Sequence, residues 1–138
     1  MDDLLALSVR QPWAHAIVHL GKDLENRSRS LGHRGLLLIH ASAVVTRQEY
    51  DAARLFMLDQ GLPAHQLPTL SALKVGGIVG AVEVTDCVAE SDSPWWMGPR
   101  ALVLRSARPL PFMPCKGTVA PLFWRPPADI VERARSLL

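Results

Sequence analysis

A glutamate inside an apolar segment is the first residue of this sequence that could do chemistry. Glu83 lies in the run 78–85, whose β-branched and small residues predict a strand. Alternation would place Glu83 on the same face as Val79 and Ala81. A carboxylate buried there without a partner is costly or takes up a proton, so Glu83 is a candidate base or ligand anchor. In the alternative, this face of a barrel-edge strand lies in water.

A second group of ionisable residues follows Gly21, which predicts a helix end. Alternation puts Asp23, Glu25 and Arg27 on one face of the next strand. If that face lines a cleft, Glu25 and Arg27 orient each other. Lys22 then donates to a phosphate or, after partial desolvation, acts as a base. The alternative is a cluster of surface salt bridges, which stabilises a protein little.

Residues 10–13 lead from a strand into a helix that Pro12 is expected to start. The unpaired N–H groups of a first helical turn, with Arg10 beside them, suit a phosphate or a carboxylate. Trp13 either stacks on a base or packs beneath the helix. We take Arg10, Gln11 and Trp13 as candidate binding residues.

Further candidates lie at strand ends and turns. Trp95 and Trp96 point opposite ways in an extended segment, so one can pack inward while the other stacks on a base. In the alternative, both rings cap a barrel end. His40 and Ser42 end an apolar strand, where they reach a ligand or serve the structure alone. Lys116 lies near a turn, as a ligand contact or as an exposed loop lysine.

The predicted elements define the scaffold for these residues. Strands are predicted at 4–9, 24–27, 35–40, 78–88, 101–105 and 119–124. Helices are predicted from Pro12 to about Leu20, from a capping box at Thr46 to about Asp59, and after Pro127. Most strands are not separated by helices as βαβ units require. We therefore expect an α+β fold, a small mixed β-barrel flanked by helices, with a surface loop at 61–75.

Charge is unevenly distributed although the net charge is only +2. Residues 26–48 contain four arginines and no acid, and residues 93–128 contain five cations and no acid. One guanidinium group can donate two parallel hydrogen bonds to the oxygens of a phosphate, so such segments suit nucleic-acid contacts. In the alternative, a genome of high GC content, which favours arginine codons, produces this composition without any function.

The 138 residues fit one domain, which we expect to span residues 1–138. No apolar run reaches the roughly 20 residues of a membrane helix, and the N-terminus lacks the basic start of a signal peptide. We expect a cytoplasmic protein with no membrane partner. Cys87 and Cys115 form neither a metal motif nor a disulfide framework, so no metal and no cofactor are expected. The oligomeric state is left open.

Five segments, taken in order, resemble those of a known family. They are residues 7–14, Gly21 and Lys22 with Glu25 to Arg27, Arg34 to Ser42, Gly77 to Glu83 with Asp86 and Cys87, and Lys116 with Gly117. With this set the chain is similar to the ASCH domain of the PUA-like superfamily over most of residues 4–124. The resemblance implies a small β-barrel with helices around a cleft that binds RNA or nucleotides. It also implies, for some members, ribonuclease activity or amide hydrolysis of acetylated cytidine.

The resemblance to the amidohydrolase branch is incomplete. Its matching positions are a lysine, a threonine three residues later and a glutamate on the later strand. This chain has Lys22 and Glu83 but carries Glu25 in place of the threonine. Without that hydroxyl, amide hydrolysis would need a water activated by Glu25 or Glu83. Lys22 and Glu83 can instead bind the Watson–Crick edge of a base without any reaction.

Two leading functions follow. In the first, the chain recognises a single-stranded base and phosphate of RNA, or a modified nucleoside, in a basic cleft. Arg10 then holds phosphate, a tryptophan stacks on the base, and Glu25, Asn26 and Glu83 read its edge. In the alternative, Lys22 and Glu83 are acid–base partners of a metal-independent hydrolase, a ribonuclease or nucleoside amidohydrolase, with Arg27 stabilising charge. A protein-interaction module is a third possibility.

Overall fold

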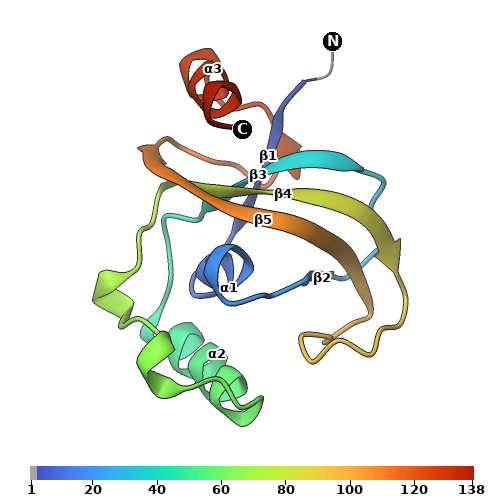
Figure 1. The fold of residues 1–138 in the computed structure, drawn as a ribbon, viewed down its shortest axis with the longest axis vertical. Helices are drawn as coiled ribbons and strands as arrows, with labels where there is room; N and C mark the ends of the chain where they lie inside the picture. The colour runs from blue at the N-terminus through green and yellow to red at the C-terminus, as the bar shows by residue number, and fades with distance from the viewer. Residues whose placement is uncertain (1–2) are drawn as a thin grey trace.

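A curled six-stranded sheet organises residues 3–138, the part of the chain that the computed structural model describes (Figure 1). Its order is β2-β5-β4-β3-β1-β6. β1 and β3 pair in parallel, and the other neighbouring strands pair antiparallel. The strands are β1 (Leu5–Val9), β2 (Leu24–Arg27), β3 (Gly35–Ala41), β4 (Gly77–Val88), β5 (Arg100–Pro114) and β6 (Phe123–Trp124).

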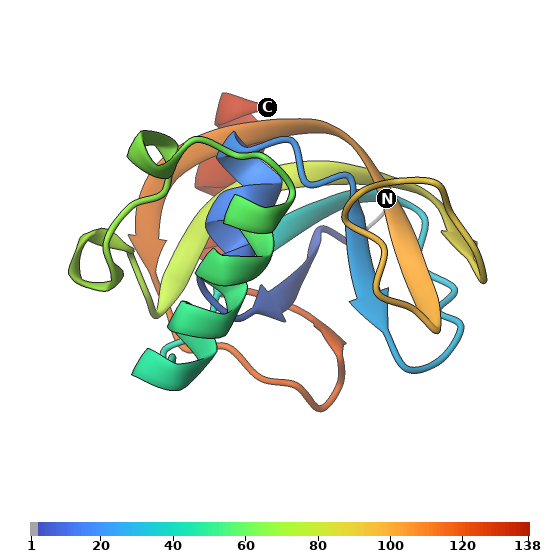
Figure 2. The same cartoon turned by 90° about the horizontal axis from the view of Figure 1, so that it is seen from below.

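Helices lie on both sides of this sheet. In Figure 1, α1 (Trp13–His19) and α2 (Arg47–Asp59) lie below it and α3 (Ala128–Leu137) lies above it. Figure 2 shows the sheet arching over α1. Short 3-10 turns, Ala64–Gln66 and Leu70–Ala72, lie in the connection from α2 to β4. The predicted α+β fold with a curled, barrel-like sheet is therefore confirmed.

The predicted helices are present with small shifts at their ends. α1 begins at Trp13, with Pro12 as its N-cap, and Gly21 has a φ of 76° just beyond its end. The capping box at α2 is confirmed, because the Thr46 hydroxyl accepts a hydrogen bond from the backbone N–H of Glu49. α3 follows Pro127 as expected.

Two predicted strand lengths were wrong. β5 continues to Pro114 because β4 pairs along almost its whole length. Its prolines are tolerated because β2 pairs only with residues 100–103, which leaves the rest of β5 as an edge. β6 is only two residues long, whereas a strand was expected over 119–124. Proline occupies positions 121, 126 and 127 around it, and proline lacks the N–H that a strand ladder needs.

The two faces of the sheet bury different clusters. The face toward α1 packs Leu7, Leu37 and Val82 with Ile17. The opposite face packs another set against α3, including Leu38, Ala81, Trp124 and Ile130. No helix in residues 3–138 is both long and apolar enough to cross a membrane.

A glycine allows α1 to approach the sheet closely. A Cβ atom at Gly80 of β4 would lie 2.7 Å from a methyl carbon of Val18 and 2.7 Å from the carbonyl oxygen of Arg108. Any side chain there would push the helix away from the strand. The position of α1 matters because the candidate site begins at this helix.

Candidate functional site

A cleft of about 830 Å³ opens between the end of β1, the helices α1 and α2, and strand β2. The loop after β3 and the loops before and after β5 complete its rim. This volume lies within the range of roughly 300–1,000 Å³ common for small-ligand sites. Its lining includes Ser8, Arg10, Gln11, Trp13, Lys22, Glu25, Asn26, Arg27, Ser42, Val44, Glu49, Phe56, Met97 and Val119.

Lys22 lies at the floor of the cleft with only 4% of its surface exposed. Its amine donates to the carbonyl oxygen of Leu24 and lies 3.4 Å from Oε1 of Glu25. The amine is also 5.6 Å from the centre of the Trp13 ring. Burial lowers the pKa of Lys22, while the Glu25 carboxylate opposes this shift.

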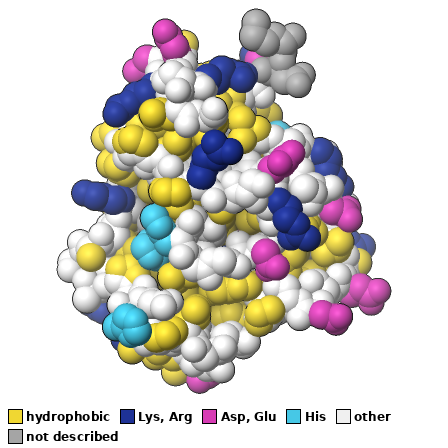
Figure 3. Space-filling model, in the orientation of Figure 1, with side chains coloured by type: hydrophobic (Ala, Val, Ile, Leu, Met, Phe, Trp, Pro, Cys, Tyr) yellow, Lys and Arg dark blue, Asp and Glu magenta, His cyan; other side chains and the backbone are white. Residues whose placement is uncertain are grey.

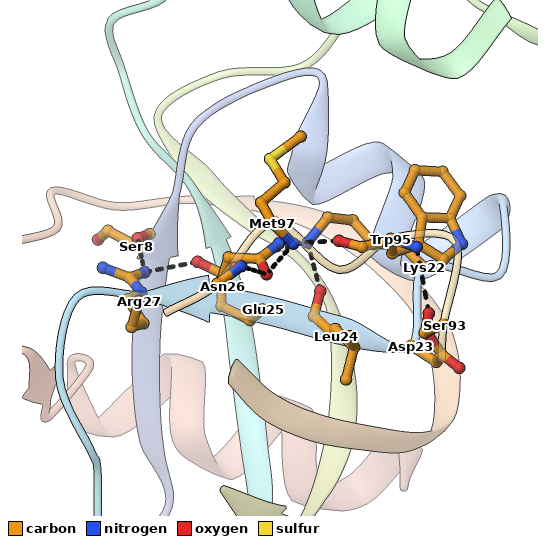
Figure 4. A network of polar contacts seen from close by, with 11 residues as sticks. Ser8, Lys22, Asp23, Leu24, Glu25, Asn26, Arg27, Ser93, Trp95 and Met97 are labelled. Carbon is orange, nitrogen blue, oxygen red and sulfur yellow. Dashed lines mark hydrogen bonds and ion pairs between the residues drawn. The ribbon is translucent and has the colours of Figure 1, made fainter. Parts of the chain in front are cut away.

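Glu25 connects the two cations of the floor. Its Oε2 atom lies 2.8 Å from Nη2 of Arg27, while Oε1 faces Lys22. The same Arg27 nitrogen is 3.5 Å from the carbonyl oxygen of Ser8, and Figure 4 shows the network along β2. The predicted pairing of Glu25 with Arg27 is confirmed. The Glu25 carboxylate thus lies between the amine of Lys22 and the guanidinium of Arg27.

Asn26 holds the 93–98 loop beside the cleft. Its Nδ2 donates to the carbonyl oxygen of Trp95, at 3.0 Å. Its Oδ1 accepts hydrogen bonds from the backbone N–H groups of Met97 and Gly98, at 2.9 and 3.2 Å. The predicted base reader is therefore occupied in positioning a loop, and that loop supplies Met97 to the cleft.

The predicted anion site at the start of α1 is filled by the protein itself. The backbone N–H of His15 donates to Oε1 of Gln11, and that of Ala14 donates to the carbonyl oxygen of Arg10. Gln11 is buried and also donates to the carbonyl oxygen of Lys74. These donors are satisfied, so the first turn offers little to a phosphate.

Arg10 lies at the rim of the cleft, paired with an acid that sequence reasoning did not select. Its Nη1 contacts both carboxylate oxygens of Glu49, at 2.9 and 3.0 Å. Glu49, Ala53 and Phe56 of α2 all line the cleft. Their spacing of three to four residues along one helix face is the signal that could have identified them.

The aromatic and apolar rim differs from the predicted one. Trp13 lines the cleft and meets Phe56 edge to face, at 5.8 Å between ring centres. Trp95 is buried, Trp96 packs against the same core cluster, and neither lines the cleft. The exposed rim side chains are instead Val44, Met97 and Val119, which are 60%, 49% and 72% exposed.

His40 is buried behind the cleft in a chain of hydrogen bonds. A carbonyl oxygen only accepts, so Nε2 of His40 donates to that of Cys115, at 2.9 Å. Nδ1 then accepts from the Ser8 hydroxyl, at 3.0 Å, and Ser8 Oγ accepts from Nε1 of Trp124, at 3.1 Å. Burial lowers the pKa of His40. Of the other strand-end candidates, Ser42 lines the cleft, whereas Lys116 is exposed in the loop after β5.

Glu83 is separated from the charged floor of the cleft. It is exposed on β4, where its register neighbours are Leu36 of β3 and Arg105 of β5. Ala81, two residues earlier on β4, is buried in the cluster covered by α3, whereas the Glu83 side chain lies in water. Of the two alternatives for Glu83, the structure shows the one in which this strand face lies in water. It does not bring Glu83 to Lys22.

Comparison with known proteins identifies the family. The chain resembles a solved structure titled "Crystal structure of ZmASCH S128A mutant protein from Zymomonas mobilis". The two are 14% identical, with a TM-score of 0.55 over 98% of this chain and 96% of that one, which supports the same fold. No curated protein matches this chain. The ASCH domain model matches residues 7–100, which contain the whole charged floor of the cleft. The chain therefore belongs to the ASCH domain family, a PUA-like group generally associated with RNA binding.

Proposed function

We propose that the cleft binds a single-stranded base of RNA or a modified nucleoside. The observation that carries this proposal is the buried floor, where the Glu25 carboxylate lies between Lys22 and Arg27. A carboxylate repels a phosphate but accepts N–H groups, and the adjacent guanidinium donates to ring nitrogens or carbonyl oxygens. The edge of a nucleobase presents both kinds of group. The floor therefore suits a base edge better than a phosphate alone.

The walls of the cleft suit the flat faces of the same ligand. Trp13 and Phe56 contribute aromatic surface, and Val44, Met97 and Val119 contribute apolar surface at the rim. Unpaired bases bind proteins through such faces because stacking and apolar contacts remove them from water. Polar groups at the floor and apolar groups at the rim thus match a base that enters edge first.

Titration with nucleosides and short single-stranded RNAs tests this proposal. Glu25→Gln keeps the shape of the side chain but removes its charge, and we expect about tenfold weaker binding or more. Glu132→Gln, on the exposed side of α3, is the matched control and should bind like the unaltered protein. Since Glu25 is part of a buried ion pair, circular dichroism must first establish that the variant is folded. Equal affinities of both folded variants would contradict the proposal.

A metal-independent hydrolase is the second candidate. The lowered pKa of Lys22 favours it, because a buried amine can lose its proton and act as a base. Its acid–base partner in this cleft is Glu25, in place of Glu83. A panel of RNAs and acylated nucleosides tests the idea. Turnover that persists in Glu83→Gln but disappears in Lys22→Ala would favour this hydrolase, and the absence of turnover across the panel would reject it.

A further inference from the structure

Two arginines face each other at the outer end of the charged floor. Arg27 of β2 and Arg100 of β5 are direct register partners, just beyond the pair formed by Glu25 and Leu102. Register partners share a face of the sheet, and neighbouring strands are about 5 Å apart. Arg100 therefore lies beside Arg27 on the same face of the sheet, but it does not line the cleft.

The two guanidinium groups have different partners. Arg27 turns toward Glu25 and the carbonyl oxygen of Ser8. Among the described residues, the Arg100 side chain makes one hydrogen bond, to the carbonyl oxygen of Pro99 at 3.3 Å. Within residues 3–138, no carboxylate lies within ion-pair distance of Arg100. Like charges directly opposite each other destabilise a strand pair, so the arrangement favours binding of an anion.

A third arginine, Arg29, follows Arg27 just beyond the end of β2. Arg29 is exposed and makes no ion pair or hydrogen bond with the residues that the structure describes. On the face seen in Figure 3, by contrast, Lys and Arg side chains are scattered among acids and form no single patch. At the outer end of β2, Arg29 and Arg100 are thus two arginines without an ion-pair partner among residues 3–138.

We propose that Arg100 binds a backbone phosphate of an RNA strand whose adjacent base occupies the cleft. This inference rests on the proposed function and deepens it, because it names a polynucleotide strand, in place of a free nucleoside, as the ligand. In this arrangement Arg27 contacts the base at the floor of the cleft, and its register partner Arg100 contacts the phosphate outside the cleft. Arg29 provides further positive charge for the strand that leaves the cleft.

The affinities of three labelled probes that carry the same base test whether the ligand is a strand. The probes are a nucleoside, its monophosphate and a hexanucleotide, and the protein is titrated into each at salt concentrations from about 50 to about 300 mM. We expect the hexanucleotide to bind at least about tenfold more tightly than the nucleoside at low salt. Arg100→Gln should weaken hexanucleotide binding about fivefold at low salt and leave nucleoside binding unchanged. It should also reduce the slope of log affinity against log salt by about 0.7, the value for one phosphate contact to a single strand.

The matched control is Arg133→Gln, an exposed arginine of α3 far along the chain from the cleft residues. If Arg100→Gln behaves like Arg133→Gln, or if the hexanucleotide binds no better than the nucleoside, the strand inference fails. Equal weakening of the monophosphate and the hexanucleotide would also overturn it, since the site would then take a terminal phosphate. Absence of binding by all three probes would instead reject the proposed function itself.

Discussion

At the scale of single residues, burial decides the roles of the ionisable groups. Lys22 and Glu25 are buried together and line the cleft, whereas Glu83 on β4 is exposed. Alternation correctly placed Glu25 and Arg27 on one face, because a strand of period two leaves no other arrangement. Alternation could not show that Glu83 is exposed while Ala81 is buried, because burial depends on packing between segments distant in sequence.

His40 is expected to make stability depend on pH. Burial lowers the pKa of His40 below its ordinary value of 6.5, and its ring nitrogens are committed to Ser8 and Cys115. The unfolded chain therefore binds a proton at a higher pH than the folded chain does. The free energy of unfolding should fall as the pH drops below about 6.5, until the pH passes the lowered pKa of the folded state.

Urea unfolding between pH 5 and 7.5 measures this dependence. His15 contributes in the same direction, because burial and the neighbouring His19 lower its pKa. His40→Gln should therefore make the free energy of unfolding fall less steeply with decreasing pH, without abolishing the fall. A pH slope in His40→Gln identical to that of the unaltered protein would show that His40 does not titrate on unfolding.

At the scale of elements, a short strand positions both the charged floor and a loop of the rim. β2 has only four residues, yet it carries Glu25, Asn26 and Arg27. Its sequence predicted a strand with a polar face, and this was confirmed. The capture of the 93–98 loop by Asn26 spans about seventy residues and carries no local signal, so the tryptophans were expected at the cleft where Met97 lies.

The two polar ends of Asn26 allow this anchoring to be tested. Asn26→Ala removes the acceptor for the N–H groups of Met97 and Gly98, and these amides should exchange with deuterium faster. Asn26→Asp keeps that acceptor but loses the donor to Trp95. We therefore expect the amides of Met97 and Gly98 to keep most of their protection from exchange in Asn26→Asp and to lose it in Asn26→Ala. Equal exchange in the unaltered protein and Asn26→Ala would show that the loop is held by other contacts.

At the scale of the whole molecule, the curled sheet brings together segments that are far apart in the chain. The end of β1, strand β2 and one face of α2 line the same cleft. The sequence patterns predicted most of these elements, and the family resemblance predicted their arrangement around a cleft. The pairing of Arg10 with Glu49 depends on the packing of α2 residues Ala53 and Met57 against Ala16 of α1 and Leu24 of β2, which periodicity within any one segment does not specify.

The central claim is that the cleft beside Trp13 receives a base of RNA, and the tryptophan indole N–H signals in nitrogen-correlated NMR spectra test it directly. Trp13 lines the cleft, whereas Trp124 lies on the opposite face of the sheet in contact with His40. On titration with a single-stranded hexanucleotide, the Trp13 signal should shift in proportion to binding and by more than the Trp124 signal, because the Trp124 N–H lies one hydrogen bond behind the cleft, on Ser8. A shift of Trp124 with an unmoved Trp13 would contradict the account.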